Sequence, residues 1–319
     1  MSIFADHDPP SFLDEPWLRQ LSDSDELSET DSLFDEIPDN SACHPEIPST
    51  TCSGTSVLCS TCVVGRRKPP PIPGFYLDPS VVIPPKRAEQ LFLSCMDTYF
   101  RNGDVNQVML FGRARERASS DIQKSQLGDM PFHPQVNSGL PAFLCALLSD
   151  LEALLRPSLP PHTHRLLFPP LSEPARARQA IVNLYRPGEG ISPHVDLLGR
   201  FGDGIIGVSL GSGCVMSFRK ELNEMQNSSH ERTEQELEER GFIRDGDGVR
   251  WDLYLPERSI LVLSDEARYE WTHGIEGRGS DMVVADDGKN GTQCIERDSR
   301  ISVTFRWLLP GAEIVGDDP

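Results

Sequence analysis

The chain has 319 residues, a formal net charge of −19, and hydrophobic residues at 38% of its positions. This length is enough for one large domain with tails, and the negative charge excludes a general electrostatic attraction to nucleic acid. No run of about 18 apolar residues occurs, so no membrane-spanning helix is expected, and the acidic first ten residues do not resemble a secretory signal. We therefore expect a protein of the cytoplasm, the nucleus or both.

An acidic segment opens the chain. Residues 1–50 carry thirteen acidic residues against one basic residue, Arg19, and residues 1–70 are rich in Ser, Asp, Glu, Pro and Thr. Such a composition cannot bury enough apolar surface to offset chain entropy, so we predict disorder over residues 1–70. The apolar residues scattered among the acids allow a segment that folds on a protein partner, with a solvated tail as the alternative. Cys59 and Cys62 form a C-x-x-C pair, but without a second closely spaced pair a zinc site is not favoured.

Residues 71–319 are predicted to form one folded domain. Apolar residues at helical spacing predict helices over 86–102 and 141–156. Short β-rich runs separated by glycines follow at 179–185, 205–210, 214–218, 259–263 and 300–308. Several short strands with Gly turns predict a sandwich or barrel. The charged stretch 219–250 is interpreted as a surface insertion, and residues 281–298 as a polar loop.

Two histidines and an aspartate form a candidate metal site. His194 and Asp196 are separated by one residue, so an extended chain points both to the same side. His273, in the stretch WTHGI, is the best candidate for a third ligand. Two His and one carboxylate form the facial triad of iron(II) oxygenases, which leaves metal positions open for a keto acid and O₂.

The run RISVTFR at 300–306 strengthens this interpretation. In a strand, Arg300, Ser302 and Arg306 share one face, while the opposite face is apolar. Two buried guanidinium groups need anionic partners, and a dicarboxylate would supply them through the planar arginine fork. Asn183 and Tyr185 alternate in the same way and offer neutral donors for the same pocket.

The ordered set of these residues resembles the AlkB family of iron and 2-oxoglutarate dioxygenases over about residues 72–310. The stretches NLYRPGEGISPHVD and ERSILVLSDEARYEWTHGI are most similar to the AlkB domain of the enzyme that hydroxylates modified wobble uridine in tRNA. The resemblance implies an α+β protein with a double-stranded β-helix (jelly-roll) core and flanking helices. It also implies that His194, Asp196 and His273 bind Fe(II), with 2-oxoglutarate and O₂ as co-substrates.

The resemblance further implies roles for the polar strand residues. Arg300 would bind the distal carboxylate of 2-oxoglutarate, and Arg306, with Asn183 and Tyr185, would hold its other end. Ser302 is a candidate ligand of the same pocket by its position in the strand, although many relatives have Asn there.

Candidate substrate residues come from two places. Phe111 and Arg113 lie where AlkB proteins have a substrate lid, whereas Tyr269 and Trp271 flank the third metal ligand; packing is an equally good explanation for the aromatic residues. A modified nucleobase in RNA or tRNA is the implied substrate, with hydroxylation and oxidative demethylation both open. This reading predicts a basic groove near the pocket, built from Arg113, Arg115, Arg117, Arg200 and Arg219. The alternatives are the same chemistry on a protein or small molecule, and a catalytically silent binding module.

Overall fold

The computed structural model of the chain describes residues 63–103, 105–112, 139–170, 173, 176–222, 236, 240–286 and 291–312. Residues 1–62 lie outside the described part, so their predicted disorder and partner binding stay predictions, as does the interpretation of Cys59 and Cys62. The candidate substrate residue Arg113 also lies outside it. No helix in the described ranges is long and apolar enough to cross a membrane.

Six antiparallel strands form the larger sheet, in the spatial order β2-β10-β6-β14-β4-β3. Neighbours in this sheet are far apart in sequence, since the last strand, β14, lies between β6 and β4. The strands are β2 (Phe75–Tyr76), β3 (Gln107–Gly112), β4 (Arg178–Tyr185), β6 (Phe201–Gly211), β10 (Ile260–Leu263) and β14 (Arg300–Leu308).

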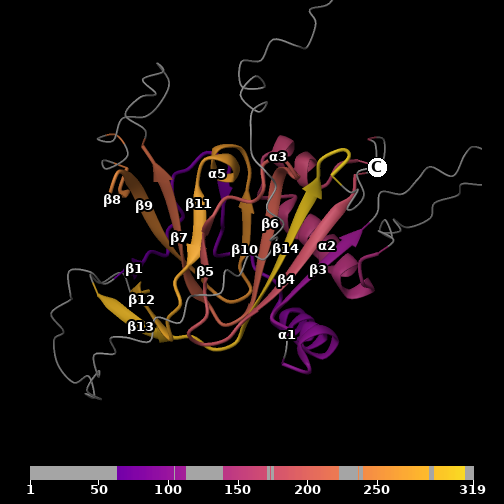
Figure 1. The fold of residues 1–319 in the computed structure, drawn as a ribbon, viewed down its shortest axis with the longest axis horizontal. Helices are drawn as coiled ribbons and strands as arrows, with labels where there is room; N and C mark the ends of the chain where they lie inside the picture. Colours follow the sequence, from indigo (N-terminus) through magenta and orange to yellow (C-terminus); the bar gives the residue numbers. More distant parts are fainter. Residues whose placement is uncertain are drawn as a thin grey trace, which may run out of the picture. The chain divides into compact units, whose positions relative to one another are not determined.

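A smaller antiparallel sheet has the order β5-β11-β7-β9-β8 and faces the larger one (Figure 1). Its strands are β5 (Ile191–His194), β7 (Cys214–Glu221), β8 (Ile243–Asp245), β9 (Gly248–Leu255) and β11 (Thr272–Ile275). Apolar side chains from both sheets, such as Leu261 of β10 and Phe218 of β7, pack into one buried cluster between them. Two such facing sheets form a double-stranded β-helix, which confirms the predicted fold class.

Helices cover the other face of the larger sheet (Figure 1). They are α1 (Pro85–Cys95), continued by the π-helical turn η2 (Met96–Phe100), α2 (Ala142–Leu155) and α3 (Pro161–Leu167). Proline begins α1 and α3, where its fixed φ and missing N–H suit the first helical turn. Leucines of α2 at helical spacing, including Leu144, Leu148 and Leu151, are buried against the sheet. The helices predicted over 86–102 and 141–156 are thus confirmed.

The alternation predicted for residues 300–306 is present in β14. Ile301, Val303 and Phe305 are buried in the cluster beneath the helices. Arg300 and Arg306 therefore lie on the opposite face, toward the smaller sheet, because side chains alternate along a strand. This strand provides one wall of the helical core and one wall of the polar interior between the sheets.

A third, three-stranded sheet corrects the predicted loop at 281–298. It consists of β1 (Val64–Gly65), β12 (Ser280–Val284) and β13 (Thr292–Glu296), with β12 between the other two. Asp281 of β12 is 1% exposed and accepts hydrogen bonds from Arg297 and Arg278 and from the backbone N–H of Val215. The polar composition suggested a loop, but the charges are paired inside the structure and support a strand.

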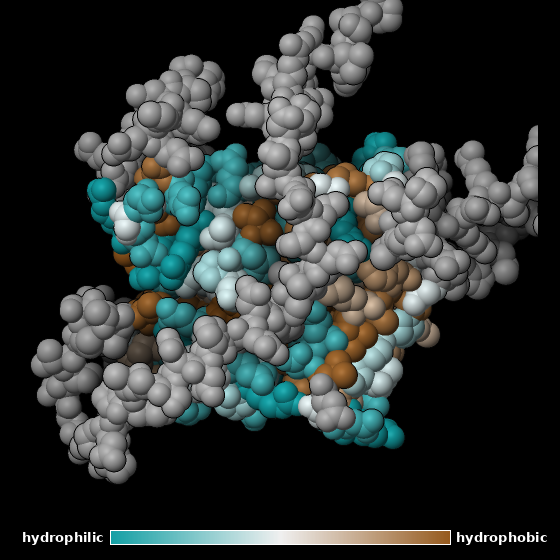
Figure 2. Space-filling view, in the orientation of Figure 1, coloured by the Kyte–Doolittle hydropathy of each residue, from teal (hydrophilic) through white to brown (hydrophobic). Residues whose placement is uncertain are grey.

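The predicted boundaries also need correction. β1 begins at Val64, so the described fold starts before residue 71. β7 continues to Glu221, and β8 and β9 occupy 243–255, so strands fill both ends of the stretch interpreted as an insertion over 219–250. Strands of two or three residues, such as β1 and β8, are too short to give a period-two signal. Figure 2 shows mainly hydrophilic side chains over β8 and β9 and a more apolar surface around β3.

Candidate active site

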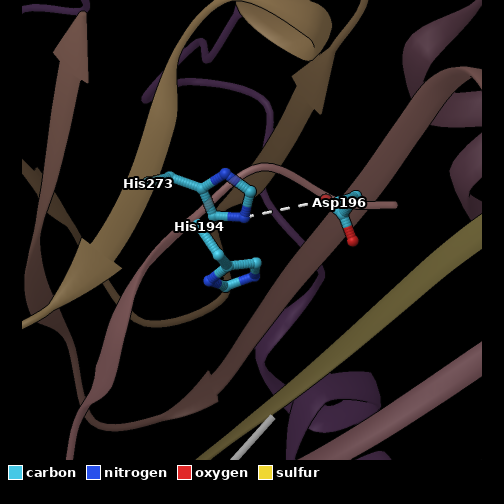
Figure 3. A group of neighbouring side chains, drawn as sticks. All are labelled: His194, Asp196 and His273. Carbon is cyan, nitrogen blue, oxygen red and sulfur yellow. Dashed lines mark ion pairs between the residues drawn. The ribbon is translucent and has the colours of Figure 1, made fainter. Parts of the chain in front are cut away.

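The three predicted metal ligands come together between the two sheets (Figure 3). His194 ends β5, Asp196 follows in the next loop, and His273 lies on β11 directly opposite His194. Their ligand atoms all lie within 4.8 Å of one another, and Nε2 of His273 is 3.7 Å from a carboxylate oxygen of Asp196. Two imidazoles and a carboxylate at this spacing can share one metal ion.

Local backbone features bring the two histidines together. A Cβ atom on Gly274 would lie 2.8 Å from the backbone nitrogen of Pro193, so only glycine allows β5 to approach β11 this closely. The carbonyl oxygen of Ser192 lies 2.9 Å from Nδ1 of His194. Because a carbonyl can only accept, Nδ1 carries the proton and Nε2 of His194 is left as the metal ligand.

Protonation states in the triad suit metal binding. Burial, with smaller contributions from the neighbouring His194, Arg306 and Arg268, lowers the pKa of His273 to about 4 against the opposing effect of Asp196. His273 is therefore neutral near pH 7 and able to coordinate a metal. Burial alone would raise the pKa of Asp196, but the neighbouring Arg306, with smaller contributions from the two histidines and Arg268, outweighs it and holds that pKa below its usual range.

Two buried arginines hold Asp196 in place. Arg306 of β14 donates a hydrogen bond from its guanidinium group to a carboxylate oxygen of Asp196. Arg268, from the short helix α5 (Asp265–Tyr269), is 2% exposed and donates to three backbone carbonyl oxygens. These belong to Asp196 at 2.9 Å, Leu197 at 3.3 Å and Phe201 at 3.2 Å. Arg306 therefore fixes the ligand's side chain and Arg268 fixes its backbone.

Arg300 has the features of an anion site. It is 5% exposed and donates to the hydroxyl of Ser209 at 2.9 Å. Its Nε and one of its terminal nitrogens have no hydrogen-bond partner among the described residues. Burying unpaired guanidinium donors is unfavourable unless an anion binds them. The residues present thus fit a carboxylate group of a co-substrate such as 2-oxoglutarate.

The other predicted pocket residues gather around Arg300. Tyr185 lies opposite Arg300 across β4 and β14, its ring centroid 5.3 Å from the guanidinium carbon. Asn183, which faces Ser302, donates a hydrogen bond to the hydroxyl of Tyr185 at 3.4 Å. The resemblance grouped Asn183 and Tyr185 with Arg306. The strand register groups them with Arg300 instead, because Arg306 lies six residues further along β14.

The candidate substrate residues differ in position. Phe111 on β3 and Tyr269 at the end of α5 are 39% and 40% exposed. Trp271, by contrast, is 1% exposed, stacks on Phe242 and donates its indole N–H to Glu266. These contacts favour packing, the alternative already open for the aromatic residues, over pocket lining for Trp271.

The described part of the predicted basic groove is not assembled as expected. Arg219 lies next to the buried Phe218 on β7, so its side chain points away from the interior. On that outer face it forms an ion pair with Asp245 at 3.4 Å. Arg200 lies in the loop after Asp196, near the site. The remaining members, Arg113, Arg115 and Arg117, lie outside the described residues.

Sequence analysis missed two residues of this site. Ser209 and Arg268 gave no signal, because a serine in a strand and an arginine in a short charged helix are usually solvated.

Comparison with known proteins fits this geometry. Residues 86–306 match the family model of the 2OG-Fe(II) oxygenase superfamily. An uncharacterized protein of Acanthamoeba polyphaga mimivirus is 38% identical over 131 residues, which cover 41% of this chain and 48% of that protein. The tRNA (carboxymethyluridine(34)-5-O)-methyltransferase alkbh8 of Xenopus tropicalis is 34% identical over 137 residues, covering 40% and 18%. The Alkylated DNA repair protein ALKBH8 homolog of Arabidopsis thaliana is 37% identical over 129 residues, covering 40% and 33%.

The chain thus spans less than half the length of each of these relatives. The family match, in contrast, includes the whole metal triad, Arg300 and Arg306. The chain belongs to the 2OG-Fe(II) oxygenase superfamily, whose chemistry uses Fe(II), 2-oxoglutarate and O₂.

Proposed function

We propose that the protein oxidises a modified nucleobase in RNA, with tRNA as the first candidate. The observation that carries the oxygenase part is the buried pairing of a metal triad with an arginine, Arg300, whose donors need an anion. Support for RNA comes from the matched segment, which is shared with a relative named as a tRNA methyltransferase.

Each end of the site has a separate task. His194, Asp196 and His273 would hold the iron through two imidazoles and one carboxylate. Arg300 would bind the distal carboxylate of 2-oxoglutarate, with the hydroxyls of Ser209 and Tyr185 beside it. The walls between the sheets are buried, which excludes water from the reacting atoms.

When bound, these groups supply the oxidation: one oxygen atom of O₂ enters a substrate C–H bond as a hydroxyl, and the other enters succinate as 2-oxoglutarate loses CO₂. If the hydroxylated carbon is attached to nitrogen, the product breaks down to formaldehyde and the dealkylated base. If it is an ordinary carbon, the hydroxyl group persists. A base within a duplex would first have to be flipped out or unpaired.

A second candidate is the same oxidation of a protein or small molecule. The net charge of −19 and the outward direction of Arg219 favour it over a strongly basic RNA-binding surface. A protein or metabolite substrate would need no such surface.

The test is succinate formation by iron-loaded full-length protein with 2-oxoglutarate, measured on admitting O₂, with and without total tRNA. His194→Ala, which lacks a metal ligand, is the control for background. Turnover that rises with tRNA and is lost in His194→Ala is expected. Turnover that ignores tRNA would refute the RNA substrate while keeping the oxygenase, and no metal binding or turnover would refute both.

A further inference from the structure

Gln179 is a buried polar residue that the proposed chemistry does not use. It lies near the start of β4, on the face that looks into the interior, and is 2% exposed. Across the sheet it stands between Phe111 of β3 and Arg306 of β14. One neighbour is thus partly exposed to solvent, and the other binds the metal ligand Asp196.

The amide of Gln179 is poorly satisfied. Its nitrogen has only the sulfur atom of Met109, at 3.9 Å, as a partner, and a thioether is a weak acceptor. Its carbonyl oxygen has no hydrogen-bond partner among the described residues. Buried side-chain amides are normally hydrogen-bonded, so an open donor and an open acceptor in one amide indicate a group that binds there.

The position of this amide separates it from the 2-oxoglutarate end. Arg300 and Arg306 are six residues apart on β14, which corresponds to roughly 20 Å along an extended strand. Gln179 lies at the Arg306 end, and the carboxylate site at Arg300 lies at the other. A carboxylate would also leave the carbonyl oxygen of Gln179 without a donor. The amide therefore lies beside the arginine that holds the metal ligand Asp196, and away from the carboxylate site.

We propose that Gln179 is a specificity-determining residue that reads the edge of the substrate base. Its carbonyl oxygen accepts a hydrogen bond from a ring N–H, and its NH₂ group donates to the adjacent carbonyl oxygen, an edge that a uracil-type or guanine-type base presents and an adenine or cytosine does not. The exposed ring of Phe111 next to it offers a stacking face. This proposal rests on the proposed function, since it names the chemical class of the base oxidised at the same site.

Two glutamines on this face allow a matched test. Gln107 of β3 donates to the side chain of Asn183 at 2.9 Å, near the Arg300 end. Gln179→Met and Gln107→Met remove an amide of the same size from opposite ends of the face. For Gln179→Met we expect the KM for total tRNA to rise roughly 5- to 150-fold, the range for losing a bidentate contact to a base. For Gln107→Met we expect the apparent affinity for 2-oxoglutarate to fall instead.

A stability measurement distinguishes recognition of the base by Gln179 from a purely structural role of its amide. Removing an amide whose hydrogen bonds are unmade should leave the melting temperature of the metal-free protein unchanged or raised, so Gln179→Met should be at least as stable as wild type. A KM for tRNA that is unchanged in Gln179→Met, or a clearly lower melting temperature, would overturn the proposal. If wild type itself shows no stimulation by tRNA, the proposed function fails, and the melting temperature still tests whether the amide is structural.

Discussion

Arg268→Met should weaken metal binding although residue 268 is not a metal ligand. The guanidinium of Arg268 donates to the backbone carbonyls of Asp196, Leu197 and Phe201, and it is buried beneath the loop that carries the ligand. Methionine keeps most of the side-chain volume and removes every donor. The carbonyl of Leu197 retains the backbone N–H groups of Arg200 and Phe201, so the chief loss is at Asp196.

The size of the effect follows from these contacts. A hydrogen bond from a charged donor contributes about 1.5–3 kcal/mol, and part of this is offset because the buried guanidinium no longer has to lose its hydration. We expect a loss of about 2–4 kcal/mol in the unfolding free energy of the metal-free protein. Residues that orient metal ligands typically change metal affinity by about 10–100-fold, and we expect a loss in that range.

Arg178→Met is the matched control. Arg178 is also buried, but on the helical side of β4, where it donates to the carbonyl of Leu167 and stacks on Trp307. It should cost stability without affecting the metal. Urea unfolding in chelator gives the stability of both variants, and anaerobic competition between the protein and a chelator gives their Fe(II) affinity. Equal metal affinities in the two variants would refute the positioning role of Arg268.

Three further outcomes are expected. Arg300→Met should reduce the apparent affinity for 2-oxoglutarate by about 30-fold or more, because it removes the partner of a buried carboxylate; an unchanged dependence of succinate formation on 2-oxoglutarate would contradict this. The metal-free protein should lose stability as the pH falls from 6.5 toward 4. Between these pH values the unfolded chain binds a proton at His273, whereas the folded protein, in which the pKa of His273 is about 4, does not. Urea unfolding measured across this pH range should show a loss of about 3 kcal/mol in unfolding free energy. A His273→Gln variant should lack this loss. Trp271→Ala should cost about 3–5 kcal/mol of unfolding free energy, as expected for a core residue, whereas a pocket-lining residue would mainly raise the KM for the substrate.

The parts of the fold that sequence predicted share one property. In β14, Arg300 and Arg306 alternate with Ile301, Val303 and Phe305, so the sequence itself distinguishes the two faces. Helix α2 likewise has a continuous apolar stripe. Where one face is buried and the other performs chemistry, the pattern is strong enough to predict an element and its orientation.

The parts that sequence missed depend on contacts between distant residues. Asp281 can be buried in a strand because Arg297 and Arg278 donate hydrogen bonds to its carboxylate. The local sequence of residues 281–298 does not predict these ion pairs. The hydrogen bond between Arg306 and Asp196 links positions 110 residues apart. Trp271 was a candidate pocket residue because it lies two residues before His273, yet its contacts with Phe242 and Glu266 hold it in the core. Such outcomes are decided by tertiary packing, which local spacing does not contain.

Charge gives the last constraint on the substrate. The chain as a whole is strongly acidic, but three arginines, Arg268, Arg300 and Arg306, are buried near the triad, where the carboxylates of Asp196 and Asp203 only partly balance them. The interior is therefore positive where the chain is negative, which suits a dianionic co-substrate and explains why net charge does not predict the ligand. Arg306 and Arg268 both hydrogen-bond to Asp196, and Arg300 would bind the co-substrate. A base can be recognised by hydrogen bonds to its edge and by stacking on its face, and the poorly satisfied amide of Gln179 beside the exposed ring of Phe111 offers both.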